Sequence, residues 1–154
     1  MQKYDIVALG GTFDIIHDGH MKLLNKAFSI SNKAIIGLTS DELAAKKGKN
    51  LLKNYHQRFE SLKSVIEKNF PNSSYEISKL ENDFGPAVIE GSVQALVVSK
   101  ETSNKGRLLN ELRSKGNLPP VEIVVVPMVL AKDGNTISTT RIKNSEIDSS
   151  GNLN

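Results

Sequence analysis

The regular alternation of short apolar runs with helical patterns constrains the fold of this chain most. The runs with the length and β-branched content of strands are residues 5–9, 34–38, 74–78, 94–99 and 121–126. Strands that alternate with helices form βαβ units with right-handed crossovers, which build a parallel sheet. We therefore predict a Rossmann-like, doubly wound α/β domain of five parallel strands, in the order 3-2-1-4-5, with helices on both faces.

The helices are predicted from apolar residues that recur at helical spacing between the runs. The first covers residues 21–31, and a short one covers residues 42–45. A longer helix has Phe59, Leu62, Ile66 and Phe70 on its core face and ends at Pro71. Two further helices are expected: a short one opened by residues 83–86, and one that ends near Gly116 and turns Leu108, Leu109 and Leu112 inward.

The composition fits one folded domain over residues 1–154. The chain has 38% hydrophobic and 24% charged residues and no cysteine, which excludes disulfides, thiolate metal sites and a cysteine nucleophile. No apolar run is long enough to cross a bilayer and residues 1–9 show no secretory signal, so we expect a cytoplasmic protein without a membrane partner. The net charge of +3 suits anionic metabolites, and 5% aromatic residues suit base stacking poorly. We therefore expect no nucleic-acid partner; the oligomeric state stays open.

A glycine- and histidine-containing segment joins the first strand to the first helix. Its residues are Gly10, Gly11, Thr12, Phe13, Asp14, Ile15, Ile16, His17, Asp18, Gly19 and His20. Paired glycines let a backbone turn sharply and approach a ligand closely. A helix N-terminus attracts phosphate, and imidazoles there add hydrogen bonds to the same group. The segment therefore predicts a phosphate site at this junction.

Two later segments carry further candidate phosphate ligands. Residues 46–53 contain four lysines and follow the second strand, at the sheet edge where open α/β sheets bind ligands. Residues 137–143 follow the last strand and place three hydroxyl residues before two basic ones. Hydroxyls, free N–H groups at a helix start and a guanidinium together form a phosphate cradle. The members of this run are Ser138, Thr139, Thr140, Arg141 and Lys143.

Both hallmark segments resemble the nucleotidylyltransferase superfamily. Gly-Gly-Thr-Phe-Asp followed by His-x-Gly-His resembles its first signature, which holds the triphosphate of ATP or CTP. Residues 137–143 resemble its Ile-Ser-Ser-Thr-x-Ile-Arg signature and depart from it at Thr139 and Lys143. Cytidylyltransferases precede a similar run with Arg-Thr-x-Gly, whereas this chain has Asp-Gly-Asn-Thr at residues 133–136. From residue 6 to residue 148 the chain is similar to archaeal-type phosphopantetheine adenylyltransferases.

That resemblance implies a reaction of ATP with 4′-phosphopantetheine that gives dephospho-CoA and pyrophosphate. Because the attacking phosphate oxygen is already ionised, catalysis needs alignment and charge neutralisation rather than a strong base. Mg²⁺ is expected to arrive on ATP and to keep mostly phosphate and water ligands. The alternatives are another small-molecule nucleotidylyltransferase, cytidylyl-transferring or FAD-forming, and a catalytically idle nucleotide-binding module.

The resemblance also assigns roles to residues. Thr12 and His20 contact the phosphates at the reacting centre, and His20 stabilises the transition state. His17 binds the β- and γ-phosphates, and residues 138–141 hold the triphosphate from the opposite side. Lys49 or Lys53 neutralises the phosphate of phosphopantetheine, with Lys46 and Lys47 as rivals. The nucleotide-binding set is Gly10, Gly11, Thr12, Phe13, Asp14, His17, His20, Arg113, Ser138, Thr139, Thr140 and Arg141.

Overall fold

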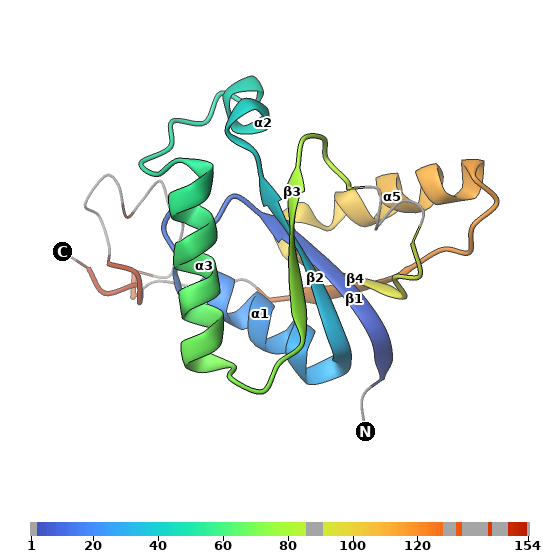
Figure 1. Ribbon diagram of the computed structural model, residues 1–154, viewed down its shortest axis with the longest axis horizontal. Helices are drawn as coiled ribbons and strands as arrows, with labels where there is room; N and C mark the ends of the chain where they lie inside the picture. Colours follow the sequence, from blue (N-terminus) through green and yellow to red (C-terminus); the bar gives the residue numbers. More distant parts are fainter. Residues whose placement is uncertain (1–2, 86–90, 128–131, 134–141, 143–147, 154) are drawn as a thin grey trace.

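The strands form one fully parallel sheet, as the alternating pattern predicts. The computed structural model describes residues 3–85, 91–127, 132–133, 142 and 148–153. In this part of the chain the sheet has five strands in the order β3-β2-β1-β4-β5, and each neighbouring pair is parallel. The predicted strand order is therefore confirmed (Figure 1). The strands are β1 (Tyr4–Gly11), β2 (Ser31–Thr39), β3 (Tyr75–Leu80), β4 (Ala95–Ser99) and β5 (Glu122–Val126).

The described helices connect these strands. They are α1 (Asp18–Ile30), α2 (Asp41–Lys46), α3 (Tyr55–Asn69), the 3₁₀ turn η1 (Lys100–Thr102) and α5 (Asn104–Lys115). Side chains cap the free N–H groups at the starts of α2 and α3: Ser40 Oγ accepts from the Leu43 amide, and Asn54 and Gln57 form a reciprocal capping box before α3. None of the helices in the described ranges is long and apolar enough to cross a membrane.

Two hydrophobic clusters lie on opposite faces of the sheet. Successive residues of β1, such as Val7 and Ala8, belong to different clusters, because side chains along a strand point alternately to the two faces. The larger cluster packs against Leu24 of α1 and Leu62 of α3, and the smaller one packs against Leu109 of α5. Figure 1 shows α1 and α3 together on one side of the strands and α5 on the other. This arrangement confirms the doubly wound architecture.

The inward face of α5 differs from the prediction. Leu109 is buried, but Leu108 and Leu112 are 48% and 40% exposed, so placing these two leucines inward was wrong. The buried face consists instead of Gly106, Leu109 and Arg113, spaced by three and four residues. Glycine lets α5 approach the sheet closely at the first position, because a Cβ there would lie 2.4 Å from the Cδ1 atom of Ile123 and would displace that side chain. The short helix predicted after residues 83–86 falls at residues outside the described ranges.

Candidate functional site

The loop between β1 and α1 lies at the carboxyl edge of the sheet, where the glycine- and histidine-containing segment was expected to bind phosphate. Gly10 and Gly11 end β1, and Gly10 lies beside Gly37 of β2. Phe13 has a φ of 51° and a side chain that is 1% exposed. A left-handed backbone at a bulky residue is costly and tends to persist where a functional loop requires it. Phe13 thereby turns the chain and fixes the loop to the core.

His17 and His20 form a capping box at the start of α1. The Nδ1 atom of His17 accepts the Gly19 amide at 3.1 Å, and the Nδ1 atom of His20 accepts the His17 amide at 3.2 Å. The two rings stack with centroids 3.9 Å apart, and His20 also packs on Phe13 at 4.7 Å. Because the backbone occupies both Nδ1 atoms, each neutral ring carries its proton on Nε2. The box therefore places the Nε2–H donors of both rings at a helix N-terminus, where His20 also has a backbone hydrogen bond to Ile15.

Burial keeps both imidazoles neutral. It lowers the pKa of His20 to about 3, with smaller contributions from the charges of His17 and Lys49 and an opposing backbone hydrogen bond to Ile15. Burial also lowers the pKa of His17, although the charge of Asp18 opposes this. Neutral donors suit a site that must bind a polyanion and release the product, since they add hydrogen bonds without a full ion pair.

Asp14 joins this loop to the lysine-containing segment. Its side chain is 3% exposed, and its two carboxylate oxygens accept the amides of Leu52 and Lys53 at 2.9 and 3.0 Å. Sequence reasoning placed Asp14 at the site without a defined role. In the structure Asp14 has an anchoring role, because its buried carboxylate accepts two amides and so holds residues 52–53 against the β1–α1 loop.

Lys49 reaches the site from the anchored segment. Its Nζ atom lies 2.9 Å from the Oγ1 atom of Thr12. Burial and then the charges of Lys47, Lys105 and Arg58 lower the pKa of the Lys49 ammonium. This crowding of cations beside a hydroxyl is costly without a bound anion, and a phosphate would relieve it. Thr12 and Lys49 are thus candidate phosphate ligands next to the histidine pair.

Arg58, on the buried face of α3, forms hydrogen bonds to the backbone of the same loops. Its side chain is fully buried, and it donates to the carbonyls of Thr12, Thr39 and Lys53 and to the carboxylate of Asp41. Sequence reasoning did not assign Arg58 to the site. The available signal was its register, because Arg58 lies four residues before Leu62 and eight before Ile66 on the buried stripe of α3.

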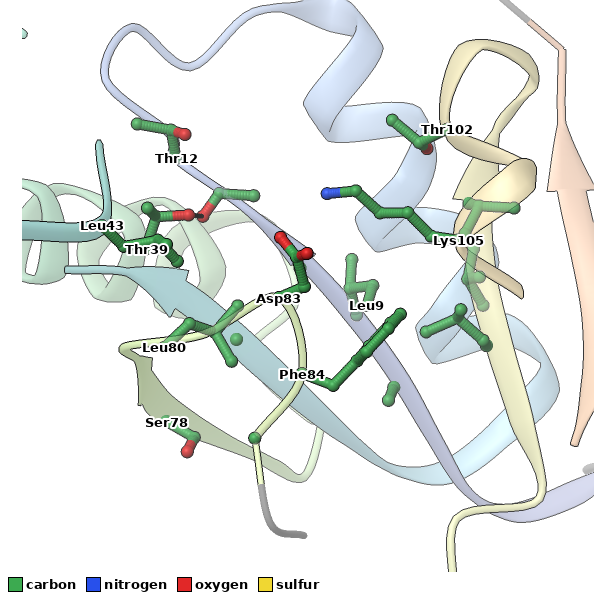
Figure 2. A pocket seen from close by; sticks show the side chains of 18 of the residues that line it. Leu9, Thr12, Thr39, Leu43, Ser78, Leu80, Asp83, Phe84, Thr102 and Lys105 are labelled. Carbon is green, nitrogen blue, oxygen red and sulfur yellow. Dashed lines mark hydrogen bonds between the residues drawn. The ribbon is translucent and has the colours of Figure 1, made fainter. Parts of the chain in front are cut away.

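A cleft extends from Thr12 and Lys49 over the carboxyl ends of β1 to β4. Including its open mouth, it has a volume of about 890 Å³. Figure 2 shows that the walls come from several elements, with Leu80 and Phe84 on one side and Thr102 and Lys105 on the other. The residues with apolar side chains on its walls include Ala8, Leu9, Leu23, Ile35, Leu43, Leu80, Phe84, Leu96, Val97 and Val98.

Charged residues stand at the mouth of this cleft, and of these sequence reasoning selected Lys47 but not Asp83 or Lys105. The Nζ atom of Lys47 and a carboxylate oxygen of Asp83 form an ion pair at 2.8 Å. Lys105, at the start of α5, points into the same space, and burial followed by the charge of Lys47 lowers its pKa (Figure 2). Of the two remaining lysine candidates, Lys53 contributes its backbone amide to Asp14, and Lys46 is exposed at the end of α2.

Arg113, which was also predicted to contact the nucleotide, lies away from this cleft. Arg113 is 3% exposed and donates to the carbonyls of Pro119 and Gly91, which precede β5 and β4. These carbonyls lie at the amino ends of the strands, whereas the histidines and lysines lie at the carboxyl ends. Residues 138–141, the predicted hydroxyl and arginine cradle, lie outside the described residues, so their contact with nucleotide stays a prediction.

The comparisons with known proteins identify the family of this chain. The family model described as cytidylyltransferase-like matches residues 8–145. A phosphopantetheine adenylyltransferase of Methanosarcina acetivorans is 43% identical, with 96% of this chain and 94% of that protein covered. The chain belongs to the phosphopantetheine adenylyltransferase family. A member from Methanothermobacter thermautotrophicus is 37% identical, with 99% and 91% covered.

A solved structure with a similar fold supports the architecture. A protein from Archaeoglobus fulgidus, described as of unknown function, superposes with a TM-score of 0.71 at 30% identity. The superposition covers 79% of this chain and 88% of that one. Family membership thus accounts for the nucleotidylyltransferase signature at the carboxyl edge of the sheet.

Proposed function

We propose that this chain transfers the adenylyl group of ATP to 4′-phosphopantetheine, forming dephospho-CoA and pyrophosphate. The observation that carries the proposal is the juxtaposition of two subsites at one sheet edge. The Nε2–H donors of the His17/His20 capping box lie within electrostatic reach of Lys49, which itself contacts Thr12. One subsite suits a triphosphate and the other a phosphate monoester, which are the two anions that the reaction joins.

The chemistry follows from these groups. An oxygen of the phosphopantetheine phosphate attacks the α-phosphorus of ATP, a new P–O bond forms, and the bond from the α-phosphorus to the bridging oxygen breaks. Pyrophosphate leaves with that electron pair. Lys49 and Thr12 align the attacking phosphate, and His20 donates to the charge that grows on the α-phosphate. His17 holds the β- and γ-phosphates, so the two histidines divide the triphosphate between them.

The cleft next to Thr12 supplies a place for the pantetheine arm. Its walls are mainly apolar, with Leu80, Phe84 and Val98 among them, and Ser78 and Asn82 add polar groups. An arm with methyl groups, methylenes and amides needs this mixture. The same walls offer little to a short phospho-alcohol, which supports phosphopantetheine over the acceptors of cytidylyltransferases.

Mg²⁺ is proposed to arrive with ATP and to supply charge neutralisation on its phosphates. The described residues contain no group of three or more histidine or acidic side chains placed for a metal. The buried carboxylate of Asp14 already accepts two amides, and Asp83 pairs with Lys47. Because both carboxylates are already engaged, the metal would keep phosphate and water ligands. It would be held through the phosphates that His17 and His20 bind. A cytoplasmic location also belongs to this proposal.

The proposal is tested by measuring pyrophosphate release with ATP or CTP against a panel of phosphate acceptors. We expect release with ATP and 4′-phosphopantetheine, and little with CTP or with phosphocholine, glycerol 3-phosphate or FMN. Comparable turnover with CTP and a phospho-alcohol would support a cytidylyltransferase instead. Tight ATP binding without release for any acceptor would support the idle nucleotide-binding module.

A further inference from the structure

Arg58 is placed where a charge costs most. Its side chain is fully buried within the first turn of α3, on the same helix face as Leu62 and Ile66. A cation near a helix N-terminus is opposed by the helix dipole, and burying it carries a desolvation penalty before any pairing. Replacing a buried ion pair by apolar residues is often neutral or stabilising. Stability alone therefore gives no reason for an arginine at this position.

The hydrogen bonds of Arg58 show what it organises instead. Its Nη1 atom donates to the Thr12 carbonyl at 2.9 Å and to the Thr39 carbonyl at 2.7 Å. Its Nε atom donates to the Lys53 carbonyl at 3.2 Å. One rigid, planar group thus joins the β1–α1 loop, the end of β2 and the lysine-containing segment.

Asp41 fixes the orientation of this guanidinium. Its Oδ1 atom accepts from the Nη2 atom of Arg58 at 2.7 Å, and its Oδ2 atom accepts the Tyr55 amide at 3.1 Å. The Tyr55 amide and then the Arg58 hydrogen bond lower the pKa of the Asp41 carboxyl, so it stays ionised. Asp41 therefore connects the start of α2 with the start of α3 through the arginine.

The two ends of the phosphate subsite both depend on this connection. Thr12 supplies a carbonyl to Arg58 and its hydroxyl to Lys49, while Lys53 supplies a carbonyl to Arg58 and its amide to Asp14. We propose that Arg58, oriented by Asp41, is a positioning residue that sets the separation between Thr12 and the lysine-containing segment for phosphoryl alignment. This inference rests on the proposed function, since it concerns the same phosphate subsite.

Arg113 provides a matched control within the same chain. It is also buried on the inward face of a helix and also donates to backbone carbonyls, those of Pro119 and Gly91. These carbonyls lie at the opposite edge of the sheet from Thr12. Replacing either arginine by lysine keeps the charge and removes the planar fork, so the two variants lose a similar structural contact at different ends of the molecule.

The test compares the R58K and R113K variants in steady-state kinetics, thermal unfolding and limited trypsin digestion. For R58K we expect kcat to fall by about 10-fold to 10²-fold, because displacing aligned groups by about 1 Å has this effect. We expect the ATP KM to change much less. R58K should also be cleaved faster after Lys49 and Lys53, as read by mass spectrometry. R113K should keep the cleavage rate of the parent chain after Lys49 and Lys53, at a similar loss of thermal stability.

The contrary outcomes are equally specific. If R58K keeps kcat within about threefold, or if both variants lose activity in proportion to their loss of stability, the positioning role is wrong. If R58K does not fold, the D41N variant is used, which keeps the Asp41 side chain nearly isosteric and must lower kcat with faster cleavage after Lys53. If the parent chain forms no dephospho-CoA, the proposed function fails, and the trypsin comparison alone decides whether Arg58 holds the segment.

Discussion

A Gly19→Ala variant tests whether the position of the histidines at the start of α1 can be disturbed without a large loss of stability. A Cβ at Gly19 would lie 2.8 Å from the Cε1 atom and 3.0 Å from the Nδ1 atom of His17. Ordinary contacts of this kind are longer, so the His17 ring must move by a sizeable fraction of an ångström. That movement weakens the 3.1 Å bond from the Gly19 amide and the ring stack with His20 at 3.9 Å.

The two energetic consequences have opposite signs. Alanine is favoured over glycine inside a helix by about 0.5–1 kcal/mol. Loss of an N-terminal capping bond costs about 0.5–2 kcal/mol. We therefore expect the free energy of unfolding of Gly19→Ala to stay within about 1.5 kcal/mol of the parent chain. The turnover of the variant should fall by about 10-fold to 10²-fold, because the displaced Nε2–H donor of His17 no longer meets the phosphates in the position that it has in the parent chain.

Pyrophosphate release and urea unfolding measure the two quantities on the same preparation. Gly116→Ala is the control, since a Cβ there meets its nearest neighbour, the Arg113 carbonyl, at an ordinary 3.6 Å and far from the histidines. This control should change neither turnover nor ATP binding. If Gly19→Ala retains full kcat and ATP KM, the exact position of the His17 ring does not matter, and the capping-box explanation of the motif is refuted.

Three further predictions concern individual groups of the site. His20→Ala should lower kcat by about 10²–10³-fold with a smaller change in ATP KM, whereas His17→Ala should mainly weaken ATP binding; the reverse pattern in steady-state kinetics would exchange their roles. Lys49→Met should raise the phosphopantetheine KM by about 10-fold to 10²-fold, since a charge-assisted hydrogen bond is lost, and an unchanged KM would exclude Lys49 from that subsite. Because burial lowers the pKa of His20 to about 3, its Cε1–H NMR signal should keep its neutral position from about pH 8 to about pH 5. In the unfolded chain this imidazole has a pKa of about 6.5, so below that pH the unfolded state gains a proton that the folded state does not. His20 should therefore make folding less favourable as the pH falls through that window. Titration of His20 near about pH 6.5 in the folded protein would contradict this.

Sequence reasoning found the central strands β1, β2 and β4 because each is a largely buried apolar run, whereas β3 was recognised from its alternating pattern. Residues 34–38 and 94–98 carry almost continuous aliphatic side chains, which parallel strands covered on both faces require. The same reasoning failed on α5, where leucines at residues 108 and 112 were assumed to face inward. The inward face there contains Gly106 and Arg113, two residues that a search for apolar side chains does not select.

The site was predictable in its position but not in its internal connections. The signature located Thr12 and the histidines, because its glycines and imidazoles have direct physical reasons to lie at a strand–helix junction. The anchoring by Asp14 and Arg58 was not predictable, since it depends on contacts between residues 38 to 46 positions apart in the chain. A charged residue in register with a buried helical stripe is the sequence signal for such contacts, and Arg58 carries that signal.

Transfer of label from ATP labelled with ³²P at the α-phosphate tests the central claim most directly. The parent chain is incubated with the labelled nucleotide and 4′-phosphopantetheine, and the products are separated and identified by mass. The account predicts that the label appears in dephospho-CoA with an equal amount of pyrophosphate, and that no label transfers when the acceptor is omitted. Label that stays in ATP while the chain binds both substrates, or that transfers equally well to an unrelated phosphate acceptor, would contradict it.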